Sequence, residues 1–325
     1  MKAIICKTYG PPSTLSLEEI QLPVPKENEV QVELKACSVN FPDTLIIQGK
    51  YQIKPPLPFT PGSDIAGIVK SVGENVKHLK VGDAVFGFTL SGGFAEAVNV
   101  DAKSIFPKPP QMDFPIAASF LMAYGTSYHA LVDRAQLKAG ETLVVLGASG
   151  GVGLAAVEIG KQLGAKVIAC ASTTEKLELC QSKGADEIIN YNKEDLKSRI
   201  KELTNGKGAD VIYDPVGSHY SEAALRAMAW EGRFLVVGFA AGEIPKIPLN
   251  LTLLKGCSIV GVFWGSFATK QPKDNLKNTY QLVEWFTEGK IKPHIDAIYP
   301  LVNAPKALQD MMDRKVRGKI VIECS

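Results

Sequence analysis

Hydrophobic and polar residues alternate in short runs along the first third of the chain. Apolar side chains stand at every second position from Val30 to Ala36, which is the period of a β-strand with one buried face. Similar patterns predict strands at residues 1–7, 65–72, 84–88 and 94–100. Glycines and prolines separate these runs, as they do between the strands of β-rich domains. We therefore expect a β-rich domain over residues 1–122.

The pattern changes from about residue 123, where apolar runs begin to alternate with helical segments. Such alternation is typical of βαβ units and of a parallel sheet. Six strands are predicted, at residues 143–146, 166–170, 187–190, 211–214, 234–237 and 258–263. Gly164 and Gly184 stand where two intervening helices should end. Residues 123–263 are therefore predicted to form a doubly wound parallel sheet of six strands, in the α/β class.

The remaining residues, 264–325, are too few for a third domain. Helical patterns cover residues 276–287 and 304–313, and a strand-like run covers residues 319–324. We expect this C-terminal segment to return to the first domain.

A glycine-rich turn follows the first strand of the second domain and leads into a helical segment at residues 154–163. The turn consists of Gly147, Ala148, Ser149, Gly150, Gly151, Val152 and Gly153. A strand, a glycine-rich turn and a helix in this order are typical of a dinucleotide site. Gly150 would let the backbone approach a pyrophosphate, and Gly153 would let the helix pack closely on the strand. The N–H groups at the start of the helix would bind the phosphates.

The end of the second strand of this domain favours NADPH over NADH. NAD-dependent enzymes place Asp or Glu there, about 20 residues after the glycines, to bind the ribose 2′-hydroxyl. This chain has Ala171 at that position, followed by Ser172 and then by Lys176. Ser172 can donate a hydrogen bond to a 2′-phosphate, and Lys176 can supply positive charge. The alternative for Lys176 is a solvated residue in the first turn of a helix.

Composition and charge exclude several other classes of protein. A formal net charge of +2 over 325 residues gives no strong attraction to nucleic acid or to an anionic membrane. No apolar run approaches the ~20 residues of a transmembrane helix, and the N-terminal residues do not form a signal peptide. The six cysteines are scattered without C-x-x-C spacing, so we expect reduced thiols and no structural zinc. These features predict a cytoplasmic protein.

Six motifs spread along nearly the whole chain carry a family resemblance. They are Ser-Val-Asn-Phe-Pro-Asp at residues 38–43, Pro-Gly-Ser-Asp-Ile-Ala-Gly at 61–67, Val-Gly-Asp-Ala-Val at 81–85, the glycine-rich turn, Asn-Tyr at 190–191, and Val-Ile-Tyr-Asp-Pro-Val-Gly at 211–217. With these motifs the chain resembles the zinc-independent medium-chain dehydrogenases/reductases, and among them the NADPH quinone oxidoreductase (zeta-crystallin-like) group. The resemblance implies a GroES-like catalytic domain, a Rossmann domain and a homodimer paired through the last Rossmann strand, residues 258–263.

The zinc ligands of the superfamily's alcohol dehydrogenases have no counterparts in this chain. Those enzymes carry a cysteine early in the β-rich domain, a histidine in a Gly-His-Glu motif and a later cysteine. The matching places hold Asn40, then Gly-Ser-Asp at residues 62–64, and no thiol near Met122. Without a Lewis acid, simple carbonyls are poor acceptors. We therefore expect NADPH-dependent hydride transfer to quinones or α,β-unsaturated carbonyls, which delocalise the incoming charge themselves.

The resemblance also implies roles for single residues. Tyr191 would lie near the 2′-phosphate or the adenine, and Thr126 near the nicotinamide. Asp214 and Phe239 follow strands, at the sheet edge where ligands bind. Asn40 would donate a hydrogen bond to the carbonyl oxygen of the substrate, unless it only satisfies the backbone of its own turn.

Two roles are possible for Tyr51, and they imply different classes of acceptor. It resembles a tyrosine of the related enoyl thioester reductases that donates a proton to the α-carbon. The alternative is a tyrosine that only shapes the cleft. A rival function is therefore an enoyl thioester reductase acting on acyl-CoA or acyl carrier protein. A second rival is an NADPH-binding protein of low turnover with a structural or RNA-associated role, against which the small net charge counts.

Overall fold

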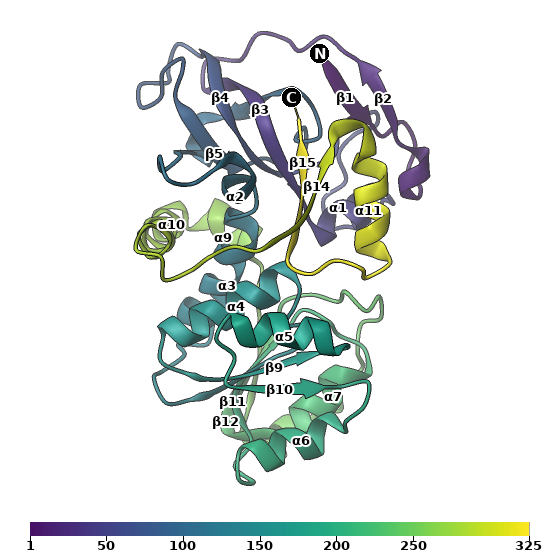
Figure 1. The fold of residues 1–325 in the computed structure, drawn as a ribbon, viewed down its shortest axis with the longest axis vertical. Coiled ribbons are helices and arrows are strands. Elements are labelled where there is room, and N and C mark those ends of the chain that lie inside the picture. The colour runs from purple at the N-terminus through teal and green to yellow at the C-terminus, as the bar shows by residue number, and fades with distance from the viewer. Residues whose placement is uncertain (325) are drawn as a thin grey trace. The chain divides into compact units, whose positions relative to one another are not determined.

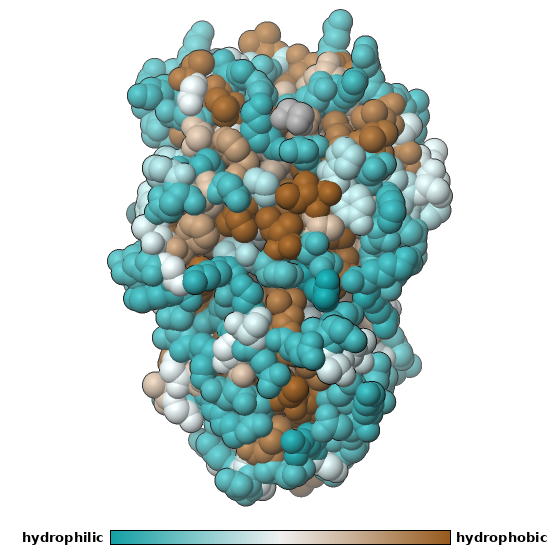
Figure 2. Space-filling view, in the orientation of Figure 1, coloured by the Kyte–Doolittle hydropathy of each residue, from teal (hydrophilic) through white to brown (hydrophobic). Residues whose placement is uncertain are grey.

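The computed structural model describes residues 1–324 and divides the chain into two compact units (Figure 1). One unit contains Met1–Met122 and the chain from Pro293 onward, and the other contains Ala123–Lys292. Figure 2 shows that hydrophilic residues cover most of the visible face of each unit. None of the described helices combines the length and the apolar character needed to cross a membrane.

The first unit is built mainly of strands, as predicted. They are β1 (Lys2–Ile5), β2 (Ser16–Glu19), β3 (Glu29–Val39), β4 (Asp64–Val72), β5 (Ala84–Phe88), β6 (Ala97–Asp101), β7 (Ile105–Pro107), β14 (Ile295–Pro300) and β15 (Lys319–Glu323). Strands β1 and β2 form an antiparallel pair. The other seven form one sheet in the order β14-β15-β3-β4-β5-β7, with β6 paired to β3. Figure 1 shows the C-terminal β15 beside β3, so the chain does return to its first unit.

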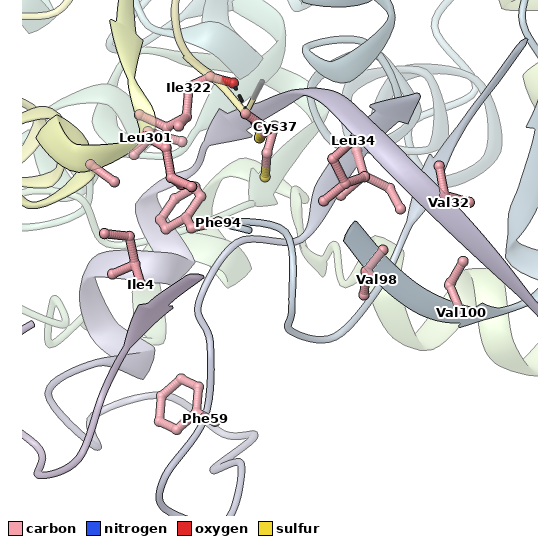
Figure 3. Packing of buried hydrophobic residues seen from close by; sticks show 14 of the residues in the cluster. Ile4, Val32, Leu34, Cys37, Phe59, Phe94, Val98, Val100, Leu301 and Ile322 are labelled. Atoms are coloured by element: carbon pink, nitrogen blue, oxygen red, sulfur yellow. Dashed lines mark hydrogen bonds between the residues drawn. The ribbon is translucent and has the colours of Figure 1, made fainter. Parts of the chain in front are cut away.

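The core of this unit explains the alternation read in the sequence. One buried apolar cluster contains Val32 and Leu34 of β3 and Val98 of β6. It also contains Phe94, which precedes β6, and Ile322 of β15. Figure 3 shows these side chains together with those of other strands in the cluster. Because β15 supplies part of this core, the C-terminal segment stabilises the first unit.

Short helices connect these strands. They are α1 (Phe41–Ile46), α2 (Phe114–Ala118) and α11 (Ala304–Met312), with single 3₁₀ turns at Pro12–Thr14, Ala102–Ser104 and Leu301–Asn303. A capping box starts α1, because the Asn40 N–H donates to the Asp43 carboxylate at 2.7 Å. A proline follows Asn40 in the first turn of α1, where its missing N–H costs nothing. The cap places Asn40 and Asp43 at the C-terminal end of β3.

The second unit contains the predicted six-stranded parallel sheet. Its strands are β8 (Thr142–Val145), β9 (Lys166–Ala171), β10 (Glu187–Asn190), β11 (Ala209–Asp214), β12 (Met228–Val236) and β13 (Ser258–Gly261). Their order is β10-β9-β8-β11-β12-β13, and every neighbouring pair is parallel. The order reverses between β8 and β11, which is the point where doubly wound sheets bind ligands.

The second unit also contains helices, some of which cover the two faces of this sheet. They are α3 (Thr126–Tyr128), α4 (Gly151–Gln162), α5 (Thr174–Ser182), α6 (Leu196–Leu203), α7 (His219–Arg226), α8 (Asn250–Lys255), α9 (Trp264–Lys270) and α10 (Pro272–Thr287), with π-helical turns at Leu121–Gly125 and His129–Arg134. Figure 1 shows α4 and α5 on one side and α6 and α7 on the other. Gly164 and Gly184 follow α4 and α5 with φ of +78° and +100°, the left-handed conformation expected after a helix.

The return of the chain to the first unit comes later than residue 264. Residues 264–292 belong to the second unit, because α9 and α10 pack on its helical segment 123–134. Asn278 donates to Asp133 at 2.7 Å, and the rings of Tyr128 and Trp285 lie 5.6 Å apart. These contacts join helices far apart in the sequence, and the pattern of single helices does not reveal them.

Candidate functional site

The glycine-rich turn lies directly after β8 at the reversal point of the sheet. Gly147 has a φ of +56°, which favours glycine. A Cβ on Gly153 would lie 2.4 Å from the Gly147 carbonyl oxygen, so this glycine is required for close packing of α4 on the turn. A Cβ on Gly150 would meet only that same oxygen, at the ordinary distance of 3.4 Å. The backbone at Gly150 is therefore open to an incoming group.

The N-terminus of α4 faces this open backbone. Gly150 is the N-cap, and no side chain caps the helix there. The first N–H groups of any α-helix lack partners within the helix, and the helix dipole adds partial positive charge. An open glycine beside an uncapped helix of 12 residues fits a pyrophosphate.

The predicted 2′-phosphate residues lie together where β9 and β10 end. Asn190 pairs with Ala171 across the two strands, and the Tyr191 N–H donates to the Ala171 carbonyl at 3.2 Å. Ala171 is buried, whereas Ser172 and Lys176 are half-buried. Lys176 lies in the first turn of α5. Ala171 takes the place of an acidic residue at the end of β9, whereas carboxylates stand nearby at Glu175 in the first turn of α5 and at Glu194, which accepts from the Asn190 N–H at 2.7 Å.

An aromatic pair borders these residues. The Tyr191 ring lies 4.5 Å from the ring of Tyr220 on α7, and Tyr220 in turn lies 4.0 Å from the ring of His219. Flat apolar faces of this kind suit an adenine base. Sequence reasoning identified Tyr191 and missed its two neighbours, because they lie almost 30 residues further along the chain.

Asp214 is at the predicted sheet edge, but its carboxylate is directed at its own loop. Oδ1 accepts from the N–H groups of Val216 and Gly217 at 2.8 and 2.9 Å, and Oδ2 accepts from the Ser221 hydroxyl at 2.5 Å. Burial raises the pKa of Asp214, and these hydrogen bonds oppose the increase. Its side chain therefore shapes the loop. Phe239 packs on this loop, since a Cβ on Gly217 would lie 2.9 Å from the Phe239 ring.

Thr126 begins α3 beside the glycine-rich turn. The adjacent Ser127 donates its hydroxyl to the Val152 carbonyl at 2.8 Å and lies 2.9 Å from the Tyr213 hydroxyl. These bonds attach the Thr126 backbone to the first turn of α4. Sequence reasoning did not select Ser127, because nothing in the local pattern shows its contacts with Val152 and Tyr213.

Asn40 in the first unit belongs to a buried polar cluster. We define this polar cluster as Ser38, Asn40, Asp43, Ser63, Asp64 and Lys319, all of which are buried. Lys319 is the first residue of β15, and its ammonium group donates to Asn40 Oδ1 at 2.5 Å. It also lies 3.8 Å from Asp64 Oδ2.

Hydrogen bonds hold the two carboxylates of the polar cluster. Asp43 accepts from the Ser63 hydroxyl at 3.2 Å, in addition to the Asn40 N–H. Asp64 accepts from the Ser38 hydroxyl and from the Met122 N–H, each at 3.3 Å. Burial raises the pKa of Asp43 to about 7 and that of Asp64 to about 6, although Lys319 opposes both increases. Burial likewise lowers the pKa of Lys319, against the attraction of Asp64 and Asp43.

The polar cluster does not fit a zinc ion. It offers no thiolate and no imidazole, and the Lys319 ammonium already lies beside the side chains of Asn40 and Asp64. A second cation there would be repelled. Over residues 1–324, no group of three or more His, Cys, Asp or Glu side chains is arranged to hold a metal ion. We therefore derive no metal-dependent step.

Tyr51 is half-buried and packs against the apolar core of the first unit. Burial raises the pKa of its hydroxyl, and the nearby Asp43 raises it further. The hydroxyl thus keeps its proton at neutral pH. Lys319 was not selected from the sequence because 279 residues separate it from Asn40. Asp43 and Asp64 were noticed only as parts of motifs.

Comparisons with known proteins agree with this arrangement. The family of alcohol dehydrogenase GroES-like domains matches residues 26–110, and the zinc-binding dehydrogenase family matches residues 151–286. A quinone oxidoreductase-like protein 2 homolog from Nematostella vectensis is 39% identical over 324 residues, which cover 99% of this chain and 88% of the relative. The quinone oxidoreductase of Sus scrofa is 37% identical over 325 residues, covering 99% and 97%.

Solved structures give the same result. The Escherichia coli quinone oxidoreductase complexed with NADPH matches with a TM-score of 0.93 and 32% identity, over 99% of this chain and 100% of that chain. The predicted classes, a GroES-like domain and a Rossmann domain, are confirmed. The chain belongs to the quinone oxidoreductase group of the medium-chain dehydrogenase/reductase superfamily of oxidoreductases.

Proposed function

We propose that this protein is a zinc-independent oxidoreductase that uses NADPH to reduce quinones or α,β-unsaturated carbonyls. One observation carries the proposal. The end of β9 presents Ala171, Ser172 and Lys176 where an NAD-dependent enzyme places an acidic residue, next to an open glycine-rich turn. Relatives that align with the whole chain are named quinone oxidoreductases, and one of them is complexed with NADPH.

The second unit would hold the cofactor. Gly147 to Gly153 and the N-terminus of α4 would bind the pyrophosphate, and Ser172, Lys176 and Tyr191 would bind the 2′-phosphate end. Thr126 would contact the nicotinamide end. Asp214 would act indirectly, by holding the loop on which Phe239 packs.

The first unit would supply the groups that act on the acceptor. When bound, the nicotinamide supplies a hydride. Asn40 would donate a hydrogen bond to the acceptor oxygen, where negative charge develops. Tyr51, whose hydroxyl stays protonated, would donate a proton to an enone or an enoyl thioester. A quinone needs no such donor because water can protonate the product.

Oxidation of NADPH against a small panel of acceptors tests the proposal. We expect turnover with naphthoquinone or a simple enone and none with a simple aldehyde. Turnover with crotonyl-CoA far above that with naphthoquinone would favour an enoyl thioester reductase. Tyr51→Phe adds a second measurement, because loss of enone reduction with retained quinone reduction would assign proton donation to this hydroxyl. No turnover with any acceptor, despite NADPH binding, would refute the proposed function.

We also propose that the enzyme is a homodimer paired through the edge strand β13. This edge carries unpaired backbone groups, and apolar side chains are exposed along and near it, namely Trp230, Leu249, Leu253, Leu254, Ile259 and Phe263. An exposed edge with apolar side chains is typical of strand pairing between subunits. The six cysteines are buried and free, which suits the reducing cytoplasm that we propose as its location.

A further inference from the structure

The carboxamide of Asn40 is held in one orientation by charges on both sides. Its oxygen accepts from the Lys319 ammonium at 2.5 Å. Its nitrogen faces acceptors only, since it lies 3.4 Å from both the carbonyl and the hydroxyl oxygen of Ser38 and donates toward the Asp64 carboxylate. A flipped amide would place N–H groups against an ammonium and an oxygen against oxygens. Asn40 can therefore serve an incoming ligand only as a donor.

The bonds that the Asn40 nitrogen makes to Ser38 are weak enough to be exchanged. Both contacts with Ser38 are longer than the usual 2.7–3.2 Å for N–H···O bonds. A ligand oxygen that gains negative charge would attract these N–H groups more strongly than the neutral oxygens of Ser38. The bond to Lys319, by contrast, is short and charge-assisted, so the oxygen end stays fixed.

Lys319 is a costly residue at this position. Its side chain is 6% exposed, and a buried ammonium group lowers stability unless it is paired. Its neighbours supply compensation, because Asp64 and Asp43 both attract it. An apolar residue on β15 would fill the same space without that cost. The structure thus keeps one positive charge next to the residue that replaces a zinc ligand.

We infer that Lys319 is a positioning residue for the reduction step, which fixes and polarises the Asn40 carboxamide as a hydrogen-bond donor to the acceptor oxygen. This inference rests on the proposed function. Withdrawal of electron density from the amide oxygen makes the Asn40 N–H groups stronger donors. The donor is then aligned before charge develops on the acceptor, which is where such preorganisation lowers the barrier.

A double-mutant cycle with Asn40→Ala and Lys319→Met tests the inference. Each protein is loaded with NADPH and mixed with naphthoquinone in single-turnover experiments, and NADPH affinity is measured separately. Each single variant should slow hydride transfer by about ten- to a hundredfold, the usual effect of losing a charge-assisted hydrogen bond. The double variant should match Asn40→Ala within about twofold, because Lys319 acts through Asn40. NADPH affinity should be unchanged, and the loss should appear in the limiting single-turnover rate and not in the naphthoquinone concentration that gives half of that rate.

Two further variants serve as controls, one for the loss of any lysine and one for a failure of Lys319→Met to fold. Lys70→Met is the matched control, because it removes a half-exposed lysine that lies on β4 and pairs with Glu33, outside the polar cluster. This variant should reduce naphthoquinone at the wild-type rate. If Lys319→Met alone does not fold, Asp64→Asn/Lys319→Met removes both members of the ion pair, and its rate is compared with that of Asp64→Asn. Wild-type rates without Lys319, or losses that multiply in the double variant, would overturn the inference. A wild-type protein that binds NADPH but reduces no acceptor would overturn the proposed function and this inference together.

Discussion

Gly150 and Gly153 stand three residues apart in the same turn, yet alanine should lower protein stability at Gly153 and NADPH affinity at Gly150. At Gly153 the new Cβ would lie 2.4, 2.7 and 2.8 Å from backbone atoms of Gly147 and Ala148. Backbone atoms cannot rotate away as a side chain can, so α4 must move from the turn. At Gly150 the only neighbour is the Gly147 oxygen at 3.4 Å, and φ −79° with ψ 171° suits alanine well.

The free energies of unfolding should differ accordingly. Alanine in a helix interior is worth about 1 kcal/mol over glycine, and overpacking costs about 1–3 kcal/mol or more. Because contacts of 2.4–2.8 Å with backbone atoms put the overpacking cost at about 2–3 kcal/mol, Gly153→Ala should lower the stability of the second unit by about 1–2 kcal/mol after that gain is subtracted. Gly150→Ala should stay within about 1 kcal/mol of wild type, because a smaller backbone entropy in the unfolded chain offsets the poorer N-cap. Its methyl group, however, would occupy the space that a pyrophosphate needs, and NADPH should bind about ten- to a hundredfold more weakly.

Urea unfolding and NADPH titration separate these outcomes. Trp230, Trp264 and Trp285 all lie in the second unit, so tryptophan fluorescence reports its unfolding alone. Each variant serves as the control for the other, since the chemical change is the same. If Gly150→Ala binds NADPH like the wild type, the glycine-rich turn does not hold the pyrophosphate. If Gly153→Ala unfolds at the wild-type midpoint, the close packing of α4 on the turn is not required.

Three further predictions concern other parts of the molecule. Lys176→Ala should weaken NADPH binding by about ten- to a hundredfold, because a charge-assisted bond to the 2′-phosphate is lost, and should leave NADH binding nearly unchanged. Equal losses of affinity for NADPH and NADH in fluorescence titrations would contradict this prediction. If the proposed dimer forms, Ile259→Glu should convert it to monomers in light scattering after gel filtration, because charge on β13 prevents edge pairing, whereas Leu90→Glu on the exposed surface of the first unit should not. Burial raises the pKa of Asp43 from 3.8 to about 7. Between about pH 4 and pH 7 the folded protein therefore keeps a proton that the unfolded chain has released, and the free energy of unfolding falls as the pH rises across that range. In Asp43→Asn the urea midpoint should fall less steeply with pH, and an unchanged slope would contradict the burial of this carboxyl.

The second unit could be predicted in detail because its signals are local. Each strand contains a short apolar run, and the glycine-rich turn is contained within seven residues. The predicted helix at residues 154–163 begins at Gly151 instead, because the last glycines of the turn already form its first turn. Short strands such as β7 and β14 were missed, since three to six residues with prolines do not show a clear alternation.

The polar cluster could not be predicted because its parts come from distant segments. A motif can show that Asn40 replaces a metal ligand, but it cannot show what compensates for the missing cation. Lys319 lies in a strand that reads as apolar, and only the antiparallel pairing of β15 with β3 brings it to Asn40. Lys319 is the first residue of this strand, where a lysine is ordinarily exposed, so the sequence carries no signal that this lysine is buried.

The polar cluster connects the absence of zinc ligands with the proposed choice of acceptor. A zinc ion places two positive charges directly on the substrate oxygen and so activates simple carbonyls. Here one positive charge acts from behind a neutral amide, with Asp64 3.8 Å away to offset part of it. Such a site stabilises developing charge less strongly, by the strength of a hydrogen bond and not of a metal bond. It should therefore serve only acceptors whose own conjugation carries most of that charge, which are the quinones and enones proposed here.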